Sequence, residues 1–216
     1  MQDSWYGDRM AGLRERKKAR THAAISDAAI ALFLDRGYDQ VSVAEVAEAA
    51  EVSKRTVFAY FPAKEDLVVH RFADHEAEQA RVVRGRPPGT GPLTALRDHF
   101  LAGLRDRDPV TGLNDVPQIL ALTRMVRETP ALRTRAVRFQ EGAGKALAQA
   151  LRETAGVPEL TARLAATQVV AVHWLLSMDN HRALADGQSA DDRFSAALAD
   201  ADHAFAVLAE GLAGYL

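Results

Sequence analysis

Cysteine is absent from the 216-residue sequence, which excludes disulfides, thiolate zinc sites and cysteine nucleophiles. Long apolar runs are missing too. The longest, VVAVHWLLSM at 169–178, contains His173 and is shorter than the roughly 20 residues that span a bilayer. The first residues, MQDSWYGDRMAG, lack the apolar core that is typical of a signal peptide. We therefore expect a cytoplasmic protein that has no membrane partner.

Sequence signatures of catalysis and of cofactor binding are also missing. No nucleophile elbow, HExxH pair or glycine-rich dinucleotide fingerprint occurs. The stretch EGAGKA at 141–146 resembles a phosphate-binding loop, but Phe139 replaces its required glycine and Ala146 its Ser or Thr. These absences predict a protein that is not an enzyme and that holds no cofactor.

What the chain does contain is helical periodicity. Apolar residues recur at helical spacing over 17–36, 93–105, 116–128, 131–155, 159–186 and 191–213, whereas strand patterns are nearly absent. The clearest linker is GRPPGTGP at 85–92. We predict an all-α fold with a three-helix head over 12–62 and a larger helical body over 63–216. A helix over 63–84 is expected to connect the two.

Helix start and stop signals divide the head into short segments. Gly37 can end the first helix in a left-handed conformation. Ser42 and Glu45 have the spacing of a capping box, and Ser53 can cap a third helix that Pro62 stops. Two short helices joined by a tight break and braced by an earlier helix indicate a helix-turn-helix.

Positive charge gathers at two places in the head, although the net charge of the chain is −2. One is a basic arm over 9–20, and the other is the pair Lys54 and Arg55 at the start of the third helix. Cations at that end oppose the helix dipole, which suggests that the end faces a stronger negative charge. In a helix-turn-helix this end enters the major groove, where Arg55 can bond guanine with two hydrogen bonds.

Residues 16–67, RKKARTHAAISDAAIALFLDRGYDQVSVAEVAEAAEVSKRTVFAYFPAKEDL, closely resemble the DNA-binding head of the tetracycline-repressor (TetR) family. The resemblance implies a transcriptional repressor that responds to a small-molecule effector. It also implies that the protein binds an inverted-repeat operator in double-stranded DNA as a homodimer. It assigns DNA-facing roles to Arg16, Lys17, Arg20, Ser42, Lys54, Arg55, Thr56, Phe58, Tyr60 and Lys64. Ala59 lacks an aromatic that the family commonly has, and Arg55 stands where a small residue is common. Both departures suggest an altered base preference.

The last helical segment carries an apolar pattern suited to subunit pairing. Its apolar residues follow alternating steps of four and three, as in a coiled-coil seam: Phe194, Leu198, Ala201, Phe205, Leu208 and Leu212. We predict that they form the homodimer interface. The alternative is that they pack only within one subunit. The preceding helix is apolar on more than one side and so needs two neighbours.

An effector site in the body is the least defined prediction. Its candidates are polar or aromatic residues on otherwise inward faces: Phe72, His75, Gln79, His99, Met125, Phe139, His173, Trp174 and Asn180. Each is also compatible with ordinary core packing. His70, Asp74 and His75 could offer metal ligands, so an all-α metal-binding sensor or enzyme with an incidental head stays open as an alternative.

Overall fold

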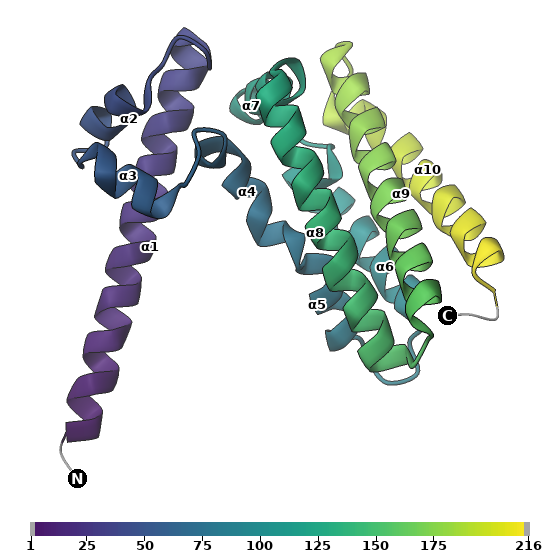
Figure 1. Ribbon diagram of the computed structural model, residues 1–216. Helices are drawn as coiled ribbons and strands as arrows, with labels where there is room; N and C mark the ends of the chain where they lie inside the picture. Colours follow the sequence, from purple (N-terminus) through teal and green to yellow (C-terminus); the bar gives the residue numbers. More distant parts are fainter. Residues whose placement is uncertain (1–2, 214–216) are drawn as a thin grey trace. The chain divides into compact units, whose positions relative to one another are not determined.

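The computed structural model describes residues 3–213, apart from the side chains of residues 3–15 and 71–74. Over this range every regular element is helical, which confirms the predicted all-α class (Figure 1). The elements are α1 (Asp3–Arg36), α2 (Val43–Ala49), α3 (Lys54–Tyr60), α4 (Asp66–Glu76), α5 (Glu78–Gly85), α6 (Pro92–Arg105), the 3-10 turn η1 (Pro109–Thr111), α7 (Pro117–Glu128), α8 (Pro130–Ala155), α9 (Glu159–Ala185) and α10 (Ala190–Gly211). None of the described helices combines the length and the apolar character that crossing a bilayer requires.

The chain divides into two compact units. One consists of Met1–His70 with Met125–Arg133, and we refer to its first part as the head. The other, the body, consists of Arg71–Arg124 and Thr134–Leu216. Helix α4 begins in the first unit and ends in the second.

The head forms around the face of α1 that carries Ile25, Ala29 and Phe33, all of which are buried. Helices α2 and α3 complete this core with Val46 and Val57, as their helical spacing predicts. Gly37 follows α1 in a left-handed conformation, with φ of 91°, so the predicted stop signal is confirmed. The start of α1 differs from the prediction, because the helix already begins at Asp3 and includes the basic arm.

The connecting segment is not one helix over 63–84, as the sequence pattern predicts. Helix α4 ends at Glu76 and α5 begins at Glu78, and Ala77 lies between them with φ of −96° and ψ of 3°. Neither glycine nor proline occurs near this break. The stretch therefore carries no local stop signal, which explains why the sequence pattern missed the break.

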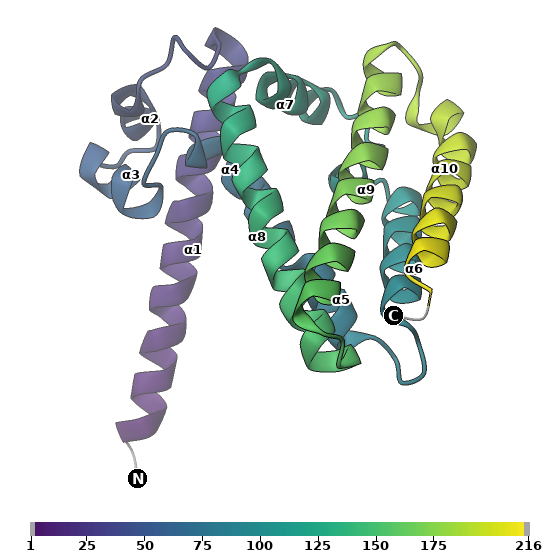
Figure 2. The ribbon, with the colours of Figure 1, turned by 45° about the vertical axis from the view of Figure 1, so that its right-hand side comes forward.

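The body has one continuous apolar core. Helix α10 packs against both α6 and α9, and the three lie side by side in both ribbon views (Figure 2). Small residues line the buried face of α9, among them Ala162, Ala165 and Ala166. The same core also contains large side chains, including Phe100 of α6 and Phe205 of α10. Small residues on one helix let its neighbours approach closely, which suits a helix that packs on several sides.

The turn after η1 presses directly on α9. Gly112 has φ of 74°, and a Cβ atom added there would lie 2.0 Å from the backbone oxygen of Ser177. Next to it, Asn180 Nδ2 donates to the Thr111 oxygen at 2.9 Å, and Asn180 Oδ1 accepts from Arg193 Nε at 3.0 Å. Asn180 is therefore a structural residue that joins three elements. These bonds use its amide within the fold, and its role in ligand binding stays a prediction.

The apolar seam predicted on the last helix faces the core of its own subunit. Its residues are buried in that core or packed against it: Phe194, Leu198, Ala201, Phe205, Leu208 and Leu212. Side chains that are already covered within the subunit cannot also form the main contact with a partner. Four of the six, Ala201, Phe205, Leu208 and Leu212, are buried in this way, which favours the alternative of packing within one subunit. The assignment of the six residues to the dimer interface stays a prediction.

Candidate functional site

The first turn of α3 presents two cations to solvent. Lys54 and Arg55 are both exposed, whereas Val57 on the opposite face is buried in the head core. The turn is fixed by Ser53, whose Oγ accepts from the Thr56 backbone nitrogen at 3.0 Å. Packing on one face and capping at the end thus hold the cationic side of the helix outward.

Two residues predicted to face DNA, Ser42 and Thr56, already make hydrogen bonds within the helix caps. The Thr56 hydroxyl lies 2.8 Å from Ser53 Oγ and is half-buried. At the start of α2, the Ser42 nitrogen donates to Glu45 Oε2 at 2.8 Å, so this N–H is not available for a DNA phosphate. The Ser42 hydroxyl accepts from the Glu45 nitrogen and stays exposed. The Ser42 hydroxyl can still donate one hydrogen bond outward, and the Thr56 hydroxyl can do so when Ser53 is the donor of the bond that they share.

The C-terminal half of α3 carries aromatic side chains with different environments. Phe58 is 43% exposed, an unusual position for an aromatic ring, and Tyr60 is half-buried. Phe61 is buried and stacks on His22 of α1, with ring centroids 4.4 Å apart, and it meets His70 of α4 at 5.0 Å. This ring cluster holds the end of α3 between α1 and α4. The position of Phe58 at the surface follows from that anchoring.

Lys64 has a structural partner inside the head. Its Nζ donates to the backbone oxygen of Tyr38 and lies 4.2 Å from the centroid of the Tyr38 ring. The side chain is half-buried, unlike Lys54 and Arg55. Sequence reasoning missed this contact, because the two residues are far apart in the chain. The basic arm differs again, since Arg16, Lys17 and Arg20 are all exposed along α1.

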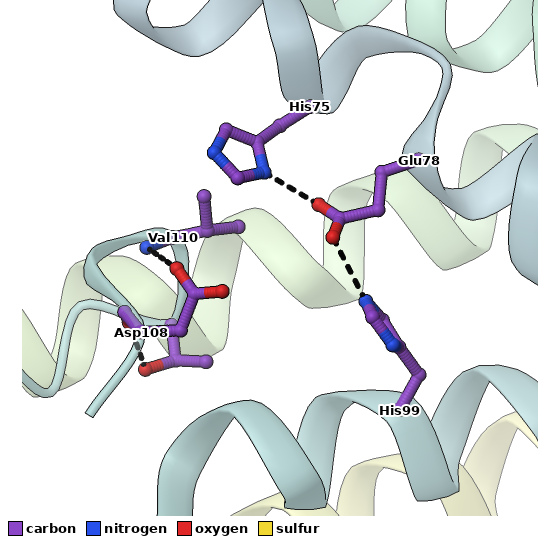
Figure 3. Close-up of polar contacts among 6 residues, drawn as sticks. His75, Glu78, His99, Asp108 and Val110 are labelled. Carbon is purple, nitrogen blue, oxygen red and sulfur yellow. Dashed lines mark hydrogen bonds and ion pairs between the residues drawn. The ribbon is translucent and has the colours of Figure 1, made fainter. Parts of the chain in front are cut away.

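The body contains a cluster of titratable side chains drawn from separate elements (Figure 3). Glu78, the first residue of α5, accepts hydrogen bonds from His75 Nδ1 at 2.6 Å and from His99 Nε2 of α6 at 3.1 Å. The bond from His75 spans the break between α4 and α5. The hydrogen bonds from His75 and then His99 hold the pKa of Glu78 well below its ordinary value, so its carboxylate is ionised. The same bond to Glu78 raises the pKa of His99.

A third histidine, His173 of α9, belongs to the same region. Its ring packs edge-on against Phe100 at 5.0 Å and against Phe205 at 5.5 Å between centroids. Burial lowers its pKa to about 4, with a further contribution from the charge of His99 nearby. Its Nε2 atom is buried and has no hydrogen-bond partner among the described residues. A neutral imidazole with an unsatisfied buried nitrogen is uncommon in a folded protein.

We call Glu78, His99, Asp108 and His173, together with His75, the histidine–carboxylate cluster. Asp108 lies ahead of η1, accepts from the Val110 nitrogen at 3.0 Å, and acts electrostatically on His99. Sequence reasoning found the three histidines but missed both carboxylates. The only local signal was the spacing of three between His75 and Glu78, which places both on one side of a helix.

The remaining effector candidates do not join this cluster. Gln79 follows Glu78, and its buried Oε1 atom has no hydrogen-bond partner within the described part of the chain, whereas Trp174 is 44% exposed on α9. Phe139 of α8 lies under Arg135, 5.9 Å from the guanidinium carbon to the ring centroid. Met125 falls in the first compact unit. The side chain of Phe72 lies outside the described residues.

The metal hypothesis gains no support from the cluster. Among the residues that the structure describes, no group of three or more histidines and carboxylates is arranged to hold a metal ion. The proposed ligand His70 lies 3.4 Å from Ser26 Oγ through its Nδ1 and packs against the rings of α1 and α3. The side chain of Asp74 lies outside the described residues.

The outer surface of the body carries an apolar stripe. Leu160, Leu164, Trp174 and Leu175 of α9 are 66%, 53%, 44% and 57% exposed. At 3.6 residues per turn they fall within about 100° of one another, on the side of α9 away from its buried alanines. Beside the stripe an open groove of about 600 Å³ runs between α8 and α9, and charges of both signs line it, among them Glu141 and Lys145. Large exposed apolar residues in one stripe indicate an interaction surface.

Comparisons with known proteins match this architecture. Residues 25–70 match the sequence profile of the bacterial regulatory proteins, tetR family. The chain is 34% identical over 147 residues to the HTH-type transcriptional regulator TcmR of Streptomyces glaucescens, an alignment that spans 68% of this chain and 65% of TcmR. The aligned part thus covers slightly less than two thirds of that relative's length.

Solved structures share the fold across most of the chain. NalD of Pseudomonas aeruginosa, described as the secondary repressor of the MexAB-OprM multidrug efflux pump, aligns with a TM-score of 0.56 at 22% identity, over 86% of this chain and 97% of NalD. FadR of Bacillus subtilis, solved in complex with stearoyl-CoA, aligns with a TM-score of 0.51 at 20% identity, over 88% and 98%. Residues 25–70 therefore carry the DNA-binding head of the tetR family of bacterial regulatory proteins, and the chain as a whole is similar to TcmR in sequence and to NalD and FadR in fold.

Proposed function

We propose that this protein is a transcriptional repressor that binds an inverted-repeat operator as a homodimer and leaves it when a small-molecule effector binds the body. The observation that carries the proposal is the first turn of α3, where Lys54 and Arg55 are exposed on a helix that is capped and buried on its other face. TcmR and NalD, a named regulator and a named repressor, support the same role. We place the protein in the cytoplasm and regard it as a binding protein rather than an enzyme.

The DNA-facing residues divide by the kind of contact that they can make. Arg55 is suited to base recognition, because a guanidinium can bond both acceptors of guanine in the major groove. Lys54, Arg16, Lys17 and Arg20 are suited to phosphates, which fix the position of the protein without reading sequence. Ser42, Thr56, Phe58, Tyr60 and Lys64 complete the proposed interface. Lys64 makes the smallest contribution of these, because its ammonium group is already bonded to Tyr38.

The proposed dimer interface is the apolar stripe of α9 with Val207, which is 54% exposed on α10. A two-fold dimer uses the same surface on both subunits, so each contact of an exposed leucine with the partner would occur twice in the dimer. A partner helix on this side supplies the second neighbour that the apolar pattern of α9 requires. Two heads related by a two-fold axis would then read two inverted half-sites.

The proposed effector site is the histidine–carboxylate cluster of the body. The bond from His75 to Glu78 spans the break between α4 and α5, so a molecule that binds beside Glu78 acts directly on the end of α4. Helix α4 begins in the head, which gives the cluster a covalent path to it. Couplings between sites are typically about 1–3 kcal/mol, enough for about 5- to 150-fold release of DNA.

Selection of bound DNA from a random pool tests the function. The full-length protein should enrich an inverted repeat, and Arg55→Ala should lose discrimination at one base position of each half-site, by about 1–3 kcal/mol. Arg105→Ala is the matched control, because Arg105 is an exposed cation in the body. Failure to enrich any sequence would refute a role in transcription. An unchanged motif with Arg55→Ala would refute the base contact alone.

A further inference from the structure

The exposed ring of Phe58 on α3 takes no part in the core of the head. Its side chain is 43% exposed, although Val57 beside it is fully buried and Phe61 is held against the rings of His22 and His70. A single exposed apolar side chain does not mark a site by itself, so its neighbours on the helix and its chemistry are decisive.

Phe58 lies on the same face of α3 as the two cations. Residues three and four apart are neighbours on a helix surface, so Phe58 adjoins Arg55 and Lys54 one turn further along. The Nζ atom of Lys54 lies 6.0 Å from the centroid of the Phe58 ring, as expected for such neighbours. The ring therefore belongs to the surface that the proposed function places in the major groove.

A phenyl ring has few possible partners in a major groove. It carries no hydrogen-bond donor for a phosphate, and the negative face of its π-system does not attract an anion. It also cannot exchange hydrogen bonds with the polar groups on the base edges. Among the groups that the base pairs present in the major groove, the C5-methyl group of thymine is the apolar one. The chemistry of Phe58 thus complements thymine.

The spacing along α3 relates such a thymine to the guanine proposed for Arg55. Phe58 is the fifth residue of α3, close to the N-terminal end by which a recognition helix contacts base edges. Three residues of a helix advance about 4.5 Å along its axis, and successive base pairs are about 3.4 Å apart. Phe58 and Arg55 therefore reach base pairs that are adjacent or nearly so.

We infer that Phe58 determines specificity by recognising the C5-methyl group of a thymine close to the guanine that Arg55 bonds. The inference rests on the proposed function, because it requires α3 to lie in a major groove. A two-fold dimer presents the contact twice, once in each half-site. Burial of one methyl group contributes about fourfold in affinity, so the two half-sites together contribute about 16-fold.

Replacement of thymine by deoxyuridine tests the inference, because deoxyuridine keeps every hydrogen-bonding group of thymine and lacks only the methyl group. The operator is the inverted repeat that the full-length protein selects, and each thymine is replaced in turn, in both half-sites at once. Fluorescence anisotropy should show an affinity loss of about 16-fold at one position near the guanine that Arg55→Ala ceases to select. Replacement at the other positions should have little effect.

Two variants assign the methyl preference to the ring. Phe58→Ala should bind the thymine operator about 16-fold more weakly and should bind the thymine and deoxyuridine operators equally well. Because Phe58 is exposed, its thermal midpoint of unfolding should stay unchanged. Ala59→Ser alters the neighbouring exposed residue of α3 and is the matched control, which should keep the methyl preference.

Persistence of the methyl preference in Phe58→Ala would refute the inference. An equal loss of affinity for both operators would also refute it, since it would place the ring against the sugar–phosphate backbone. Equal binding of both operators by the unaltered protein, or unchanged DNA binding by Phe58→Ala, would refute it too. Failure to select any operator would instead refute the proposed function, so the two failures are distinguishable.

Discussion

If the dimer interface is the apolar stripe of α9, Leu164→Ala should weaken subunit association, whereas Phe205→Ala on the neighbouring α10 should weaken folding of the subunit. Leu164 on α9 is 53% exposed, so a partner can cover about half of its side chain. Full burial of a leucine contributes about 1.5–3 kcal/mol, so Leu164→Ala should cost roughly 1 kcal/mol per subunit. Both subunits contribute the same contact, which gives roughly 2 kcal/mol per dimer and about a 30-fold weaker association. Phe205 is 2% exposed in its own core, where Phe→Ala costs about 3–5 kcal/mol of folding free energy.

Sedimentation equilibrium and urea unfolding together distinguish the two sites. Leu164→Ala should raise the dimer dissociation constant about 30-fold and leave the unfolding free energy of the monomer nearly unchanged. Phe205→Ala should lower the unfolding free energy, and its dimer should fail only when the subunit unfolds. Leu164→Glu should abolish dimers, since it would bury an unpaired charge at the interface. The reasoning is refuted if Leu164→Ala leaves association unchanged while Phe205→Ala yields a stable, folded monomer.

Three further predictions concern stability. Gly112→Ala should destabilise the body by about 2–4 kcal/mol in urea unfolding, because it combines a positive φ with a clash against the Ser177 oxygen, and an unchanged midpoint would contradict this packing. Ser42→Ala should cost about 1 kcal/mol by removing the capping box of α2, and Ser42→Asp should restore most of it, both read from thermal unfolding. The pKa of His99 is raised above its ordinary 6.5 by Glu78, so its stabilising contribution is complete below pH 6.5 and lost as pH rises through the folded-state pKa. His99→Gln should flatten that part of the stability–pH curve, and an unaltered curve would exclude the pair as its source.

Local signals were sufficient for most of the helices and for the caps of the head, but not for the start of α1 or for the break between α4 and α5. The capping box of Ser42 and Glu45 and the cap of Ser53 involve residues three apart, so their geometry is set within one turn of chain. The left-handed Gly37 is likewise a property of a single residue. Because the exposed face of α3 is defined by what its opposite face buries, helical spacing was also enough to place Lys54 and Arg55 outward.

Periodicity could not assign the last two helices to their partners. A seam with steps of four and three looks the same whether it faces a second subunit or the subunit's own core. The structure places Phe205 in the core and leaves Leu164 exposed, which only the packing of α6, α9 and α10 could decide.

The candidate effector cluster depended still more on tertiary structure. Glu78, His99, Asp108 and His173 are distributed over nearly half the chain, and no spacing in the sequence relates them. The break between α4 and α5 has no glycine or proline to mark it, yet it places Glu78 where both His75 and His99 can donate to it. The sequence by itself thus determined most of the helices and the capped short helices of the head, since these follow from contacts between near neighbours in the chain. Only the tertiary structure determined which buried polar groups meet and which remain unsatisfied, because those relations arise when distant segments pack together.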